Sequence, residues 1–289
     1  RIGAKNMAYL FLVLIILEGS LEVVLAKEYN LKTAKPNCNL FTAVVCFCAL
    51  CFFLLNSGGR LSFEASLIPY SLGFAVAFGT ASATAIFAIK TGPISITSLM
   101  SSYSLLIPTF YGLLFLKEMP HTTLYFGLVA WAVSLFLINF KKNENLHFTP
   151  MWIVYVLLCF ISNGMCSTVQ KMQQIAFDGA YKNEFMIYAL IPVTLVLFIL
   201  GFMQPGNKIA MLKPCLKYGV VKGLANGFMN NLVMVTSAML PNAVLFPSIS
   251  AGGLVLTFIC AVTLYKEKLS RMQYIGYGLG IIAVVLLNV

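Results

Sequence analysis

Long apolar runs fill most of this chain, and polar residues gather in the short stretches between the runs. A helix that spans a bilayer needs about 20 consecutive, mostly apolar residues. Ten runs fit that length, at 7–26, 37–55, 69–89, 93–116, 122–140, 151–170, 185–203, 218–238, 243–264 and 271–288. The runs lack the period-two alternation of membrane strands, so we expect ten transmembrane helices and an all-α integral membrane protein.

The stretches between the runs carry turn and charge signals, such as "NSGGRLSFE", "KKNENLHFTP" and "YKEKLSR". They are too short to hold a soluble domain. The first run reads better as a spanning helix than as a cleavable signal peptide, because it lacks a convincing small-residue cleavage site.

Composition supports the membrane assignment. The 289 residues are 60% hydrophobic and 10% charged, with a mean hydropathy of +0.90, whereas soluble domains carry about 25% charged residues. We therefore expect a multi-pass protein of the cell membrane (inner or plasma membrane). The formal charge is +10. We attribute it to basic residues that set the membrane topology and contact anionic lipid headgroups, and we expect no nucleic-acid partner.

The two halves of the sequence resemble each other. "LFLKEMPHTTLYFGLVAWAVSLFLIN" at 114–139 aligns with "TLYKEKLSRMQYIGYGLGIIAVVLLN" at 263–288, and "SLEVVLAK" at 20–27 aligns with "GMCSTVQK" at 164–171. The pattern predicts two five-helix repeats, 1–145 and 146–289. Because five is odd, the second repeat enters the membrane from the opposite face, which is the inverted-repeat plan of secondary transporters.

With the lysines that end the first and sixth runs, the tight "KTGP" and "LPN" links and the Lys-Glu pairs that close the fourth and ninth runs, the chain resembles the ten-helix drug/metabolite transporter superfamily, in its EamA-like branch. The resemblance covers essentially the whole chain and implies secondary transport of small organic solutes. One departure is that many members carry Trp-Gly in the middle of the first helix, where this chain has Glu18-Gly19.

Glu18 and Glu22 lie within the first apolar run, four residues apart and so on one face of a helix. A charge in mid-bilayer costs roughly 2.5–3.5 kcal/mol on insertion scales. We therefore expect both acids to face the protein interior, as substrate-binding and coupling residues shared between a proton and a cationic substrate. The alternative is structural, in which each glutamate bonds a neighbour or pairs with a buried lysine.

Three further runs offer polar side chains that could line the same interior space. The eighth carries Lys222, Asn226 and Asn230 at successive spacings of four, the sixth carries Asn163, and the fourth carries Ser102 and Tyr103. A polar stripe on a spanning helix avoids lipid, so it lines a cavity or bonds a neighbouring helix. An alternative for Lys222 is that its ammonium group extends to the membrane surface. Pro108 is expected to kink the fourth helix.

These residues predict a secondary active transporter of a small polar or cationic metabolite, with alternating access and coupling to a proton or to exchange. One alternative is an exchanger of an anionic solute, such as a nucleotide sugar, through Lys171 and Lys222. The other is a non-transporting receptor or scaffold. No enzyme, metal site or cofactor is expected, because the two histidines, His121 and His147, lie in linkers. The expected partners are a small solute and the bilayer, and the sequence leaves open whether the protein forms a homodimer.

The sequence supports two orientations of the chain in the membrane. Most basic residues between the runs follow the odd-numbered runs, among them Lys32, Lys213 and Lys217. Counting them places that side in the cytoplasm and both termini outside. The resemblance instead implies cytoplasmic termini.

Overall fold

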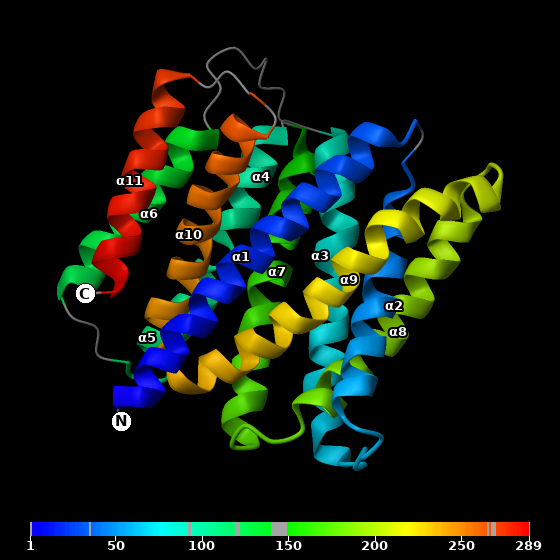
Figure 1. Ribbon diagram of the computed structural model, residues 1–289, viewed down its shortest axis with the longest axis horizontal. Coiled ribbons are helices and arrows are strands. Elements are labelled where there is room, and N and C mark those ends of the chain that lie inside the picture. The colour runs from blue at the N-terminus through cyan, green and yellow to red at the C-terminus, as the bar shows by residue number, and fades with distance from the viewer. Residues whose placement is uncertain are drawn as a thin grey trace. The chain divides into compact units, whose positions relative to one another are not determined.

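A computed structural model describes residues 2–34, 36–91, 94–118, 122–139, 149–264, 266 and 270–288. Every regular element in these ranges is helical (Figure 1). The helices are α1 (Ile2–Lys32), α2 (Cys38–Asn56), the short 3₁₀ helix η1 (Ala65–Leu67), α3 (Ile68–Thr91), α4 (Ile94–Tyr103), α5 (Leu106–Leu114), α6 (Thr122–Asn139), α7 (Pro150–Ala176), α8 (Lys182–Met203), α9 (Lys208–Met239), α10 (Asn242–Thr263) and α11 (Arg271–Asn288). His121 and His147 lie outside the described residues.

Over its described residues, each of the ten apolar runs is mainly helical, which confirms the all-helical prediction. Among the described residues, six helical stretches are long and apolar enough to cross a membrane: Asn6–Lys32, Cys38–Asn56, Ala65–Ala88, Pro150–Ala176, Lys182–Met203 and Asn242–Cys260. Two shorter apolar helices cover Thr122–Ile138 and Arg271–Leu287. A multi-pass membrane protein follows from these helices, whereas a full set of ten spans stays a prediction.

The run at 93–116 forms two helices, because the helical pattern is interrupted at Ser104 and Leu105. Pro108 has no N–H group, so it cannot donate to the carbonyl of Ser104 four residues earlier. That carbonyl instead accepts from the Ile107 N–H at 3.0 Å. The interruption therefore lies one turn before the proline, where the missing hydrogen bond would have closed.

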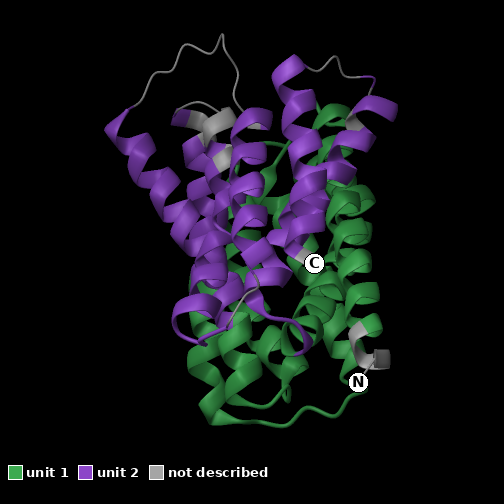
Figure 2. Cartoon of the chain, turned by 90° about the vertical axis from the view of Figure 1, so that its left-hand side faces the viewer, with its two compact units in different colours: residues 1–76, 170–238 green, residues 77–169, 239–289 purple. Residues whose placement is uncertain are grey.

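The chain divides into two compact units, each built from both halves of the sequence (Figure 2). Unit 1 contains residues 1–76 and 170–238, and unit 2 contains residues 77–169 and 239–289. The boundary between them cuts α3 and α7, and it also separates Met239 from the rest of α9. The predicted repeats, 1–145 and 146–289, describe a likeness in sequence rather than these compact units, and they stay a prediction.

Unit 1 is held together by close contacts of α2 with α8 and α9. Asn37 caps α2 by accepting from the Leu40 N–H at 2.9 Å, and its amide donates to the Gly201 carbonyl at the end of α8 at 2.9 Å. On α9, Gly223 faces α2 so closely that an added Cβ would lie 2.5 Å from the Val45 carbonyl. This close approach places the neighbouring polar face of α9 inside the unit.

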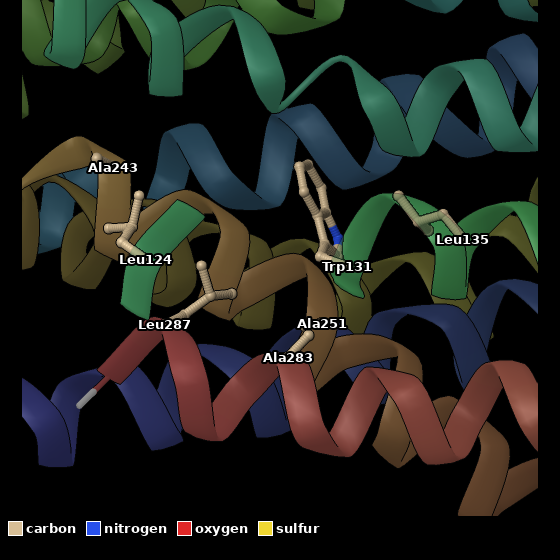
Figure 3. Packing of buried hydrophobic residues seen from close by; sticks show 7 residues of the cluster. All are labelled: Leu124, Trp131, Leu135, Ala243, Ala251, Ala283 and Leu287. Atoms are coloured by element: carbon tan, nitrogen blue, oxygen red, sulfur yellow. The ribbon is translucent and has the colours of Figure 1, made fainter. Parts of the chain in front are cut away.

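The core of unit 2 lies between α6, α10 and α11 (Figure 3). Its buried members are Leu124, Trp131, Leu135, Ala243, Ala251, Ala283 and Leu287. The Trp131 ring is fully buried, and its indole N–H donates to Ser250 Oγ on α10 at 3.0 Å. Apolar packing together with one satisfied polar group therefore fixes α6 against α10.

Candidate functional site

The two glutamates lie on α1, where α1 runs antiparallel to α9 within unit 1. Glu22 lies opposite Lys222 and Asn226. Gly19, earlier on α1, lies against Met229, later on α9, since an added Cβ there would be 3.7 Å from the Met229 methyl group. Both acids are partly buried, and the crossing with α9 supplies their polar neighbours.

Glu22 is held by two donors from α9. Lys222 Nζ lies 3.1 Å from Glu22 Oε2 and 3.2 Å from the Glu22 carbonyl oxygen. Asn226 donates its amide to Glu22 Oε1 at 3.0 Å. The side chains of Lys222 and Glu22 are 19% and 13% exposed, so this ion pair is largely enclosed. The Lys222 side chain turns to the acid inside the unit, and its positive charge neutralises that carboxylate.

The hydrogen bonds continue from Asn226 to α7. Asn230 donates to the Asn226 carbonyl at 2.9 Å and to Asn226 Oδ1 at 3.2 Å. Gln170, on the part of α7 that belongs to unit 1, donates to Asn230 Oδ1 at 2.8 Å. We call this connected set (Glu22, Lys222, Asn226, Asn230 and Gln170) the polar ladder. It joins α1, α9 and α7, and the majority of its hydrogen bonds run from side chain to side chain.

Glu18 stands one turn from the polar ladder and is bonded differently. Its Oε2 atom is enclosed, and no described residue donates a hydrogen bond to it. Glu22, in contrast, has a donor on each of its carboxylate oxygens. An enclosed acceptor without a donor is costly unless the oxygen carries a proton or meets a ligand or water. The structure therefore separates two acids that the sequence treats as equivalent.

The remaining candidates belong to unit 2, where they bond backbone or hydroxyl groups. Tyr103 donates its hydroxyl to the Ala132 carbonyl on α6. Asn163 donates to Ser104 Oγ at 2.7 Å and to the Ser101 carbonyl at 3.3 Å. Ser102 is partly buried and also has an interacting partner. Tyr103 and Asn163 thus hold helices together in unit 2. Asn163 does so by donating to residues at the interruption between α4 and α5.

Gln170 is the ladder residue that the sequence-based site omitted. It is 4% exposed and lies on α7 at helical spacing from Asn163, Ser167 and Gln174. That polar stripe was a usable signal, because polar side chains on one face of a spanning helix turn away from lipid. Reading the stripe to its end would have found Gln170.

Metal chemistry gains no support from the described part of the chain, where no three His, Cys, Asp or Glu side chains group closely enough to hold an ion. The ladder's amide, ammonium and carboxylate groups can form hydrogen bonds, and its ammonium and carboxylate groups can also gain or lose a proton. Its potential ligands are a proton or a small polar solute.

No family model and no curated protein matches the sequence. Solved structures do match the fold, among them a crystal structure of a protein with 13% sequence identity and a TM-score of 0.73. The match covers 97% of this chain and 96% of that one. At this identity the likeness shows a shared fold over the full length and nothing about function.

Proposed function

We propose that this protein is a secondary active transporter that moves a small polar or cationic organic metabolite by alternating access, coupled to a proton or to exchange at Glu18. The observation that carries the proposal is the unequal bonding of the two acids on α1. Glu22 has a donor on both oxygens, whereas Glu18 Oε2 is enclosed without a described donor. A coupling acid must exchange partners during a cycle, so it needs an oxygen that structural bonds do not occupy.

Local charge favours a cation or a proton over an anion. Glu18 and Glu22 contribute two negative charges when ionised, and Lys222 contributes one positive charge. The cluster therefore has a net charge of about −1 with Glu18 ionised, and is neutral when Glu18 is protonated. An anionic solute would meet repulsion or no attraction here, which weighs against the nucleotide-sugar alternative at Lys222.

The membrane setting adds to the argument. Glu18 and Glu22 lie within Asn6–Lys32, which is long and apolar enough to cross a bilayer. Ionisable groups in such a segment are expensive and mark transport pathways or proton relays. A receptor or scaffold has no need for an enclosed carboxylate oxygen without a described donor, so Glu18 gives this class no support.

Proteoliposomes that contain a trapped pH dye test the proposal. Choline and putrescine serve as cationic probes, alanine as a zwitterionic probe and succinate as an anionic probe. We expect proton movement with a cationic or zwitterionic probe, its loss in Glu18→Gln and its partial retention in Glu18→Asp. Glu22→Gln serves as the matched acid control, in which proton coupling persists although binding weakens.

Two results would contradict the proposal. One is a flux of succinate that survives Glu18→Gln and is lost in Lys222→Gln, because this pattern assigns the site to an anion. The other is equal proton coupling in the wild-type protein and in Glu18→Gln, because this removes the acid from the cycle.

A further inference from the structure

A second polar site lies in unit 1, at the end of α1 and the beginning of α9. A cavity of about 680 Å³ opens there, within the about 300–1,000 Å³ that is typical of small-molecule sites. Lys32, Lys213 and Lys217 line it together with Tyr218, and no acidic residue is among its described lining residues. The cavity therefore offers positive charge in a concave setting.

The three lysines differ in their freedom to meet a ligand. Lys32 Nζ lies 2.5 Å from Glu28 Oε2, so an acid already neutralises it. Lys213 and Lys217 are exposed and lie four residues apart on α9. Side chains at this spacing have Cβ atoms about 5–6 Å apart on one face of a helix, so two ammonium groups can approach the same anion. Lys213 and Lys217 are thus the pair suited to binding.

Packing keeps the wall of this cavity in place. Lys217 Nζ lies 5.2 Å from the centroid of the Tyr218 ring, and Tyr218 packs edge-on against the buried Tyr29. Tyr29 in turn accepts from the Asn37 N–H at 2.9 Å. The first amides of α9 are already used, because Asn207 Oδ1 accepts from Ile209 and Ala210. The lysine ammonium groups, rather than the helix amides, are left to bind an anion.

The position of the cavity indicates where the anion comes from. It adjoins Lys32, the last residue of the Asn6–Lys32 stretch that can cross a membrane, which is the level of lipid headgroups. In the orientation that lysine counting favours, the first of the two orientations above, this side is cytoplasmic, and anionic lipids are abundant in the cytoplasmic leaflet. We propose that this cavity binds a phosphate-bearing anion through Lys213 and Lys217, either an anionic phospholipid headgroup or a soluble phosphate.

The experiment uses the full chain in lipid nanodiscs. Phosphatidylglycerol is titrated into phosphatidylcholine discs, and inorganic phosphate is titrated in a parallel arm with phosphatidylcholine alone. Bound phosphatidylglycerol is counted by native mass spectrometry, and phosphate binding is read from the thermal-unfolding midpoint. The variants are Lys213→Gln/Lys217→Gln and the charge-retaining Lys213→Arg/Lys217→Arg. Arg60→Gln/Lys182→Gln is the matched control, since it removes the same charge from residues of unit 1 outside the cavity.

We expect the glutamine pair at 213 and 217 to weaken phosphatidylglycerol binding about thirtyfold, while the arginine pair and the matched control retain it. A lysine-dependent effect in the phosphate arm alone assigns the site to a soluble phosphate. Equal losses in the cavity variant and the matched control would reduce the effect to overall charge and overturn the proposal. Absence of lysine-dependent binding in both arms would also overturn it.

Discussion

Units 1 and 2 satisfy their enclosed polar groups in different ways. In the polar ladder of unit 1, Glu22, Lys222 and Asn226 bond mainly to one another through charged and amide side chains. In unit 2, Tyr103 and Ser134 donate to backbone carbonyls of neighbouring helices. The helices α4, α5, α6 and α10 contain no charged residue. These four helices form an uncharged packed frame in unit 2, whereas unit 1 carries an ion pair inside a stretch that is apolar enough to cross a membrane.

This difference separates stability from function. A hydroxyl that bonds a carbonyl on the next helix fixes two helices and has no second partner to exchange with. Charged side chains in a span cost free energy that packing alone would avoid. Under the proposed function, we therefore expect substitutions in the ladder to alter transport as well as stability, and substitutions in unit 2 to alter stability alone.

The largest effect is expected from breaking the ladder's ion pair. Lys222→Met leaves Glu22 largely enclosed without its cation, which costs about 3 kcal/mol of unfolding free energy. Chemical unfolding in mild detergent measures the loss. Glu22→Gln/Lys222→Met removes both charges and should recover most of the stability. If Lys222→Met unfolds like the wild-type protein, the pair is not a buried contact.

Packing in unit 2 gives the next largest effect. An added Cβ at Gly276 would lie 2.8 Å from Ile138 Cγ1 and 3.0 Å from the Ile138 backbone nitrogen. Gly276→Val therefore forces α11 away from α6 and costs about 2 kcal/mol. Gly278→Val is the matched control, because an added Cβ there meets nothing within 4 Å. Equal thermal stability of the two valine variants would contradict the close packing of α6 and α11.

A smaller effect is expected at the start of α10. Glu118 accepts from the N–H groups of Asn242 at 2.9 Å and Ala243 at 3.0 Å. Glu118→Gln keeps one acceptor oxygen but loses the second and the negative charge, at a cost of about 1 kcal/mol. Glu118→Ala loses both bonds and should cost more. Thermal unfolding of the two variants checks the order, and a reversed order would refute the cap.

Substitution of Ser134 in unit 2 can be compared directly with substitution of Asn226 in the ladder of unit 1. Ser134 Oγ donates to the Gly276 carbonyl at 2.6 Å. Ser134→Ala should cost about 0.6 kcal/mol, the average for such bonds between membrane helices, and leave flux in proteoliposomes unchanged. Asn226→Ala, in the ladder, should reduce flux. Loss of flux in Ser134→Ala alone would reverse the roles assigned to the two units.

The smallest effect concerns an exposed acid of unit 1 outside the spans. Hydrogen bonds from Ser66, whose hydroxyl lies 2.6 Å away, hold the pKa of Glu64 below its ordinary value of 4.5. This favours the folded state above the ordinary pKa, and the benefit disappears as pH falls through the lowered one. Ser66→Ala should return the Glu64 pKa toward 4.5 in an NMR titration. An unchanged titration would remove the hydrogen bond as the cause.

The sequence predicted the helices well, because long apolar runs can satisfy their backbone in a membrane only as helices or barrels. It also placed Lys222, Asn226 and Asn230 on one face, and in the structure this face bonds to neighbouring helices. Whether their role extends to a solute stays a prediction. Periodicity along one helix identifies a polar face, which is why this part of the ladder could be found.

What the sequence did not reveal depends on contacts between distant segments. Periodicity does not say which of two acids on one face meets Lys222, so Glu18 and Glu22 appeared equivalent. Pro108 indicated a break in the fourth run, but the bond from Asn163 to Ser104 at that break required the position of α7 beside α4 and α5. The compact units combine segments from both halves, and a linear repeat carries no information about that division.

The central claim is that Glu18 is the exchangeable acid and Glu22 the satisfied one. A hydrophobic carbodiimide, which modifies protonated carboxyl groups in apolar surroundings, tests this in the purified protein at neutral pH without knowledge of the solute. Peptide mapping by mass spectrometry should find modification at Glu18 and little at Glu22, with Glu22 becoming reactive in Lys222→Met. Modification of Glu22 in preference to Glu18 in the wild-type protein would contradict the account.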